Sequence, residues 1–148
     1  MEFRYSQICT NIEQSERLIA LGLKYETADM KLVRDFGYLL DEQARITIWE
    51  PQTLATHNNF KEFVDSMTTN LKGIDVQYIK DGYKPAWSLH RLIEMCNNTQ
   101  FGMTIGIYHD EVTVDGDLFE VFDNTYDNLI SIIEWLISLD KFNENYLK

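Results

Sequence analysis

The side chains that could serve as the base of a nucleophilic triad in this sequence are three histidines, His57, His90 and His109. A nucleophilic triad needs a serine or cysteine beside a histidine that a carboxylate holds in place. Ser88 and His90 stand two residues apart in a predicted helix, so their side chains point to different sides. The sequence also has no G-x-S-x-G motif. The pattern therefore favours Ser88 as a local helix cap over Ser88 as a nucleophile.

A metal site is the next chemistry that the sequence could support. His109-Asp110-Glu111 and Asp115-Gly116-Asp117 occupy two neighbouring predicted turns, and their oxygen ligands suit a hard cation. Their spacing matches neither the H-E-x-x-H motif nor an EF-hand loop. A small metal-assisted enzyme, with His109, Asp110 and Glu111 near the 109–117 turns, is therefore an alternative hypothesis. The favoured hypothesis has no catalytic residues, no metal and no cofactor.

The charge of the chain is distributed unevenly. The formal net charge is −11, and no lysine or arginine lies between Arg91 and Lys141. We call residues 92–140 the acidic segment. It contains ten carboxylates: Glu94, Asp110, Glu111, Asp115, Asp117, Glu120, Asp123, Asp127, Glu134 and Asp140. A surface of this sign repels nucleic acid and anionic lipid and attracts cationic partners.

A protein partner with a basic surface is the interaction that this charge predicts, with no direct binding to nucleic acid and no membrane binding. Asp115, Asp117 and Glu120 are the carboxylates that we expect to contact it. Trp87 and Tyr83 are candidate anchors, because Tyr and Trp bury a large area at low entropy cost. The competing interpretation is that Trp87 packs against the start of a helix. A small-molecule-binding domain, with an apolar and aromatic pocket, is a further alternative.

Length and composition predict one globular domain, residues 1–148. A chain of 148 residues with 45% hydrophobic content can bury a core without a disulfide or a metal. Cys9 and Cys96 belong to no Cys-x-x-Cys pair or Cys/His cluster, so we expect two reduced thiols in a cytoplasmic protein. The N-terminus has no apolar signal-peptide region, and Glu134 interrupts the longest apolar stretch near the C-terminus.

Capping signals and 3.6-residue periodicity predict four helices. The first spans residues 11–21, with Thr10-Asn11-Ile12-Glu13 as a capping box and Gly22 at its C-cap. The second begins after Asn58 or Asn59, runs to Leu71 and is closed by Gly73. The third spans residues 85–96 with Pro85 in its first turn, and the fourth follows a cap at Asn124.

Alternating apolar residues predict the strands. Short runs at 30–33 and 45–49, the second stopped by Pro51, are followed by a strand at 74–78 before an Asp81-Gly82 turn. Residues 101–122 predict a three-stranded meander with a turn at Asp115-Gly116. Short turns make these strands antiparallel. The expected fold is therefore α+β, a single antiparallel sheet of five to six strands with four helices packed on it.

Several short segments carry a family resemblance. They are Glu13-Gln14 with Arg17–Leu23, Thr27-Ala28-Asp29-Met30, Pro85-Ala86-Trp87-Ser88-Leu89 and Tyr126–Ile130 with Trp135-Leu136-Ile137. In this order they resemble a family of small prophage and mobile-element proteins of gut anaerobic bacteria. Residues 54–80 are longer than the family pattern and are interpreted as an insertion. The resemblance implies a phage or mobile-element context and brings no catalytic residues with it. An inhibitor or an immunity-like protein fits that context.

Overall fold

The computed structural model describes residues 7–35, 48–70, 81–98, 105–108, 111–114, 117–118 and 124–148. The α+β class expected from the sequence is confirmed: the described residues include the helices α1, α2, α4 and α5 and antiparallel strands. The elements are α1 (Ile12–Ala20), the 3-10 helix η1 (Tyr25–Thr27), β1 (Met30–Asp35), β2 (Ile48–Thr53), α2 (Phe60–Asn70), β3 (Tyr83–Ala86), α4 (Leu89–Asn97), β4 (Ile105–Tyr108), β5 (Glu111–Val114), β6 (Asp117–Leu118), α5 (Thr125–Ser138) and the 3-10 helix η2 (Glu144–Tyr146).

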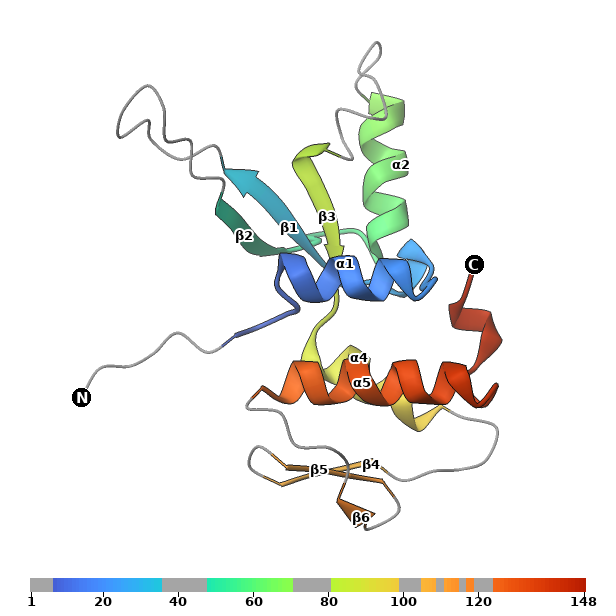
Figure 1. Cartoon of the computed structure of the whole chain (residues 1–148). Coiled ribbons are helices and arrows are strands. Elements are labelled where there is room, and N and C mark those ends of the chain that lie inside the picture. Colours follow the sequence, from blue (N-terminus) through green and yellow to red (C-terminus); the bar gives the residue numbers. More distant parts are fainter. Residues whose placement is uncertain are drawn as a thin grey trace, which may run out of the picture.

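In the described residues the strands form two sheets of three strands each, so the prediction of one sheet of five to six strands is not confirmed. One sheet has the order β2-β1-β3 and the other β4-β5-β6, and both are antiparallel. Figure 1 shows α4 and α5 lying between the two sheets, with α1 beside α5. The second sheet matches the predicted C-terminal meander in part, since β4, β5 and β6 lie within residues 101–122.

The two prolines of the chain lie on the two outer strands of the β2-β1-β3 sheet. Pro51 in β2 is opposite Leu32, and Pro85 in β3 is opposite Lys31. Neighbouring residues of β1 direct their backbone groups to opposite sides. This register therefore lets both proline nitrogens face away from β1, where a missing N–H breaks no ladder bond. Two sequence predictions are wrong here, because Pro51 does not end its strand and Pro85 belongs to a strand instead of a helix.

The start of α1 differs from the predicted capping box by one residue, whereas its C-terminal signal is confirmed. The capping box of α1 uses Asn11 and Gln14 instead of Thr10 and Glu13: the Gln14 amide donates to the Asn11 side chain at 2.8 Å, and the Gln14 side chain accepts from the Asn11 amide. Gly22 has φ +97° and follows the C-cap of α1, as predicted.

The other caps also come from short polar side chains. Asn59 accepts from the Glu62 amide at the start of α2, Asn124 caps α5, and Ser88 caps α4. Because Ser88 is the cap, α4 begins at Leu89 and not at residue 85. Asp81 and Gly82, predicted as a turn, are helical. The predicted strand at 74–78 and Gly73 lie outside the described residues.

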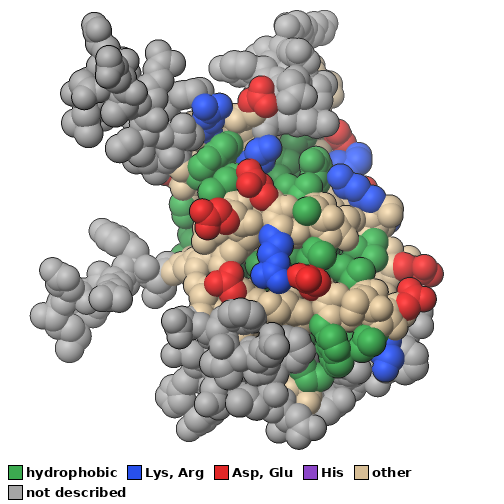
Figure 2. All heavy atoms as spheres, viewed as in Figure 1, with side chains coloured by type: hydrophobic (Ala, Val, Ile, Leu, Met, Phe, Trp, Pro, Cys, Tyr) green, Lys and Arg blue, Asp and Glu red, His purple; other side chains and the backbone are tan. Residues whose placement is uncertain are grey.

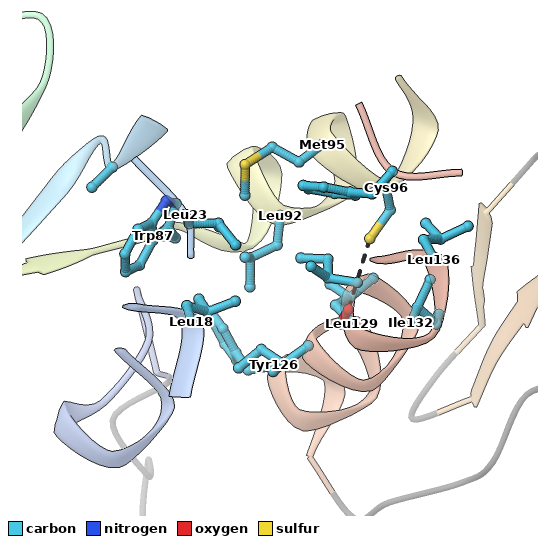
Figure 3. Packing of buried hydrophobic residues seen from close by; sticks show 14 of the residues in the cluster. Leu18, Leu23, Trp87, Leu92, Met95, Cys96, Tyr126, Leu129, Ile132 and Leu136 are labelled. Atoms are coloured by element: carbon cyan, nitrogen blue, oxygen red, sulfur yellow. Dashed lines mark hydrogen bonds between the residues drawn. The ribbon is translucent and has the colours of Figure 1, made fainter. Parts of the chain in front are cut away.

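The core lies where α1, α4 and α5 meet (Figure 3). Its fully buried apolar side chains are Leu18, Leu23, Trp87, Leu92, Met95, Cys96, Leu129, Ile130, Ile132, Ile133 and Leu136. The members in α4 and α5 recur at helical spacing, so these two helices each turn an apolar stripe inward, while Leu18 comes from α1. Cys96 Sγ lies 3.8 Å from the Leu129 carbonyl oxygen, where α4 packs on α5. No helix in the described residues is long and apolar enough to span a bilayer.

Residues 141–148, which we call the C-terminal strap, cross over the segment between α1 and η1. Phe142 is buried against the core, and Leu147 forms a β-bridge with Leu23. The Lys148 amide donates to the Gly22 carbonyl at 2.8 Å. The strap therefore fixes α5 to the chain that enters η1.

Candidate functional site

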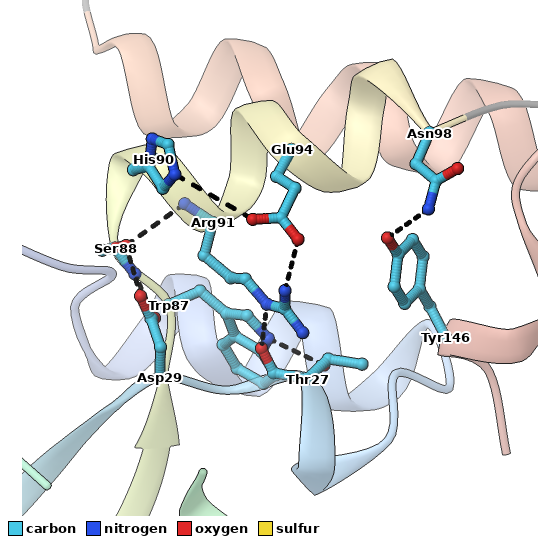
Figure 4. A network of polar contacts seen from close by, with 9 residues as sticks. All are labelled: Thr27, Asp29, Trp87, Ser88, His90, Arg91, Glu94, Asn98 and Tyr146. Carbon is cyan, nitrogen blue, oxygen red and sulfur yellow. Dashed lines mark hydrogen bonds and ion pairs between the residues drawn. The ribbon is translucent and has the colours of Figure 1, made fainter. Parts of the chain in front are cut away.

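Two segments far apart in the sequence meet beside the core and share a polar network (Figure 4). Trp87 Nε1 donates to Thr27 Oγ1 at 2.9 Å, and the Thr27 hydroxyl in turn donates to the Lys24 carbonyl at 2.6 Å. Asp29 accepts from both the backbone amide and the hydroxyl of Ser88, at 2.8 and 2.5 Å. The segments 27–29 and 87–88, both quoted above for the family resemblance, are therefore one structural unit.

Arg91 extends this network from α4 toward η1. Its Nε donates to the Thr27 carbonyl at 2.8 Å, and its guanidinium pairs with Glu94 at 2.7 Å. The Arg91 guanidinium also lies 5.9 Å from the ring centroid of Tyr146 in the C-terminal strap. Its orientation is therefore set by three neighbours from different parts of the chain.

A cavity of about 310 Å³ opens next to Arg91, and we call it the polar pocket. It lies between η1, the start of α2 and α4. Its lining residues are Glu26, Thr27, Ala28, Asp29, Asn58, Asn59, His90, Arg91 and Glu94. Backbone bonds hold these walls together: the Phe60 amide, at the start of α2, donates to the Ala28 carbonyl at 3.0 Å.

The charges around the polar pocket are mainly negative. Glu26, Asp29 and Glu94 contribute three carboxylates against the single guanidinium of Arg91. Glu26 is exposed, and Glu94 keeps 47% of its side chain exposed despite its bond to Arg91. The pocket therefore suits a cationic group that can donate hydrogen bonds to these carboxylates.

The pocket does not bring a serine and a histidine together as a nucleophile and its base. The Ser88 hydroxyl donates to Asp29 and accepts from the Arg91 amide at 3.2 Å, which is the geometry of a helix cap. His90 is 89% exposed, and its Nε2 is 4.0 Å from Glu94. These two side chains therefore have separate partners, in agreement with the cap interpretation of Ser88.

Trp87 is fully buried, so the prediction of an exposed anchor at this position is wrong. Its ring packs into the core and its indole N–H bonds to Thr27, which leaves no surface for a partner. Tyr83 is half-buried and makes an edge-to-face contact with Phe63, with ring centroids 5.1 Å apart. Lys31 Nζ lies 4.0 Å above that same Phe63 ring. Tyr83 thus belongs to an aromatic cluster between the sheet and α2.

The remaining predicted site residues lie outside the described part of the chain. His109, Asp110, Asp115 and Glu120 are not described, and for Glu111 and Asp117 only the backbone is, in β5 and β6. The metal hypothesis for His109, Asp110 and Glu111 stays a prediction. Among the described residues, no three metal-binding side chains come together.

Three carboxylates of the acidic segment already have partners within the chain. Glu94 pairs with Arg91, and Glu134 pairs with Arg17 at 2.7 Å. Asp127 accepts from Gln14 Nε2 at 2.8 Å. Figure 2 shows the corresponding pattern: acidic and basic side chains stand side by side between α1 and α5. The described part of the acidic segment is therefore less uniformly negative at the surface than its sequence suggests.

The two thiols are free, buried and in separate clusters. Cys9 packs with Leu32 and Ala86, whereas Cys96 lies in the main core. Burial, with a smaller contribution from the charge of Asp29, raises the pKa of Cys9 to about 11. Burial also raises the pKa of Cys96 to about 12. Both are thus neutral and shielded, so neither has the low-pKa environment of a reactive cysteine.

Comparison of the chain with protein families, curated proteins and solved structures finds no match. The polar pocket was not predicted from the sequence, because its walls come from segments about 60 residues apart. Its only local signal was the pair of motifs, Thr27-Ala28-Asp29-Met30 and Pro85–Leu89, that the family resemblance singles out.

Proposed function

We propose that this chain is a non-catalytic protein-interaction module that binds a partner with a basic surface. In this proposal the polar pocket receives a cationic side chain of the partner, and the acidic segment contacts the surface around it. A phage or mobile-element protein that inhibits a basic partner, or gives immunity against one, would have this design.

The charge of the polar pocket is the observation that carries the proposal. Its three carboxylates face a single guanidinium, and the Ser88 hydroxyl beside them serves as a cap. Glu94 belongs both to the pocket and to the acidic segment, so the two features are continuous in the chain. Such a field speeds encounters with a cationic protein and disfavours anionic ones.

A labelled oligo-arginine peptide is a direct probe of this proposal. We expect saturable binding by fluorescence anisotropy, and weaker binding when Glu26→Gln and Glu94→Gln are combined. Glutamine keeps the size and a hydrogen-bond acceptor for Arg91 and removes two charges. The matched control combines Glu16→Gln and Glu50→Gln, which removes two charges from exposed positions on α1 and β2.

The comparison of these two variants shows whether the peptide binds at the polar pocket or is attracted only by the net charge of the protein. Loss of affinity in the pocket variant alone supports the proposal. Equal loss in both variants would show that only net charge matters, and no binding by the unchanged protein would contradict the proposal.

The acidic segment has its own test. Asp115→Asn, Asp117→Asn and Glu120→Gln together remove three charges and keep side-chain size, so folding should survive. We expect association with the probe to slow in this variant. In the unchanged protein it should also slow between about 50 and 300 mM salt, because exposed charges are screened beyond a Debye length. Association indifferent to both changes would contradict a role for these carboxylates.

Binding of a small molecule is a second candidate, favoured by one observation. The pocket volume of about 310 Å³ lies at the lower end of the range for ligand sites, which is roughly 300–1,000 Å³. A free guanidinium compound such as arginine amide distinguishes the two by its affinity. Binding as tight as that of the peptide favours a small-molecule site, whereas much weaker binding favours a protein partner that also contacts the surface around the pocket.

A further inference from the structure

Tyr146 in the C-terminal strap contacts the residue before η1 and the C-terminal end of α4, and η1 and α4 carry Thr27 and Arg91 of the polar pocket. Its backbone carbonyl accepts from the Lys24 amide at 2.9 Å, at the residue that precedes η1. Its hydroxyl accepts from Asn98 Nδ2 at 2.7 Å, at the C-terminal end of α4. Its ring lies 5.9 Å from the Arg91 guanidinium, so one residue links η1 with α4 (Figure 4).

The arrangement restricts how Arg91 can move. A cation over an aromatic face is held by the ring quadrupole, and the ring also covers it from water. The ring itself is fixed at its hydroxyl by Asn98 and packs against Phe142, with centroids 5.7 Å apart. Because Phe142 is buried in the core, its contact holds the Tyr146 ring in place beside Arg91.

We propose that Tyr146 is a positioning residue of the polar pocket, and that it holds Arg91 in its bonds to Thr27 and Glu94. The C-terminal strap thereby sets the charge balance of the pocket: if Arg91 left this position, the carboxylate of Glu94 would lose its ion pair with the guanidinium. The consequence for partner binding rests on the proposed function, whereas the effect on Arg91 does not.

Hydrogen exchange of two side-chain N–H groups tests this role by NMR in mildly acidic buffer. The Arg91 Nε–H and the Trp87 indole N–H both bond to Thr27, but only Arg91 contacts Tyr146. In Tyr146→Ala we expect exchange at Arg91 to speed up roughly tenfold more than exchange at Trp87, as local opening would produce. Lys148→Ala, which removes a contact with the Tyr25 ring and leaves Tyr146 in place, should not change the ratio.

A purely structural role predicts a different result. Tyr146→Ala would then speed exchange at Arg91 and Trp87 by the same factor, or leave Arg91 unchanged, and either outcome would overturn the proposal. If Tyr146→Ala does not fold, Tyr146→Phe keeps the ring and removes the bond to Asn98. It should raise the Arg91 to Trp87 ratio by a smaller factor, and an unchanged ratio there would also overturn the proposal.

Binding of the oligo-arginine peptide to the same variants gives a second readout. We expect Tyr146→Ala to change the affinity, since Glu94 is then no longer held by Arg91. If the unchanged protein does not bind the peptide, the proposed function fails, while the exchange ratio still decides whether Tyr146 positions Arg91.

Discussion

Thr27 shows how one hydroxyl can join segments that are distant in the sequence. The Thr27 hydroxyl oxygen accepts a hydrogen bond from the Trp87 indole N–H, and the hydroxyl donates to the Lys24 carbonyl. Thr27 is only 4% exposed. The bond to Trp87 is buried, where water cannot replace it, so this hydroxyl satisfies a buried donor that would otherwise be costly.

Thr27→Val should therefore destabilise the protein by about 1–3 kcal/mol, because it leaves the Trp87 indole N–H buried without an acceptor. Thr27→Ser keeps the hydroxyl and should cost less. Urea titration followed by circular dichroism measures both. A valine variant as stable as the serine variant would show that this hydrogen bond contributes little.

The exposure of Trp87 was not predictable from its neighbours in the sequence. Proximity to a helix start and to Tyr83 fits an exposed anchor and a buried staple equally well. Trp87 is buried because Thr27, 60 residues away, supplies an acceptor for its indole N–H, and because the core has room for its ring. By contrast, the role of Ser88 as a cap follows from local spacing alone, and the structure confirms it.

The secondary-structure elements were predictable where one local signal has a single interpretation. Gly22 after an amphipathic stretch, and Asn124 before an apolar one, mark the correct ends of α1 and α5. The start of α1 was misplaced because two overlapping patterns fit a capping box. Tertiary contacts decide between them: the Thr10 hydroxyl lies 2.7 Å from Ser15 Oγ and accepts from the Trp87 amide.

A proline at residue 85 fits two kinds of structure, and no local pattern distinguishes them. It is common in the first turn of a helix and on the outer strand of a sheet. Pairing of β3 with β1, which joins residues far apart in the sequence such as Lys31 and Pro85, selects the strand. Sheet organisation was beyond prediction for the same reason, because turn lengths do not tell which strands share a sheet.

The final helix, α5, contributes much of the core and offers a matched pair of leucines. Leu136 is fully buried, whereas Leu139 is 44% exposed one turn later. We expect Leu136→Ala to cost about 2–5 kcal/mol through lost packing and a cavity. Leu139→Ala should cost less than about 0.5 kcal/mol, as at other exposed sites. Equal losses in denaturant titration would show that α5 is not packed as described.

At the scale of the whole molecule, two buried thiols and the phenol of Tyr126 predict how the free energy of unfolding depends on pH. The pKa values of Cys9, Cys96 and Tyr126 are raised by burial to about 11, 12 and 12, from ordinary values of 9.0 for the thiols and 10.0 for the phenol. The folded protein therefore holds these protons at pH values where the unfolded chain has lost them, which favours unfolding as pH rises.

The contribution of these groups should be constant below about pH 9 and should fall between about pH 9 and 12. Urea midpoints measured across this range test the expectation. A variant with Cys9→Ala and Cys96→Ala should lose less stability over the same interval, with Tyr126 as the remaining group. A variant with the same alkaline decline as the unchanged protein would show that the thiols do not contribute.

The placement of the two prolines also bears on how this molecule can meet others. An outer strand ordinarily presents a row of free amides to which another chain can add as a further strand, and such addition leads to aggregation. Pro51 and Pro85 interrupt that row on the two outer strands of the β2-β1-β3 sheet in the described part of the chain. Neither flank offers an unbroken ladder, so recognition by backbone pairing is disfavoured there. At these two edges another chain would have to be recognised by side chains instead of by backbone pairing, and the same interruption disfavours strand addition between copies of this chain.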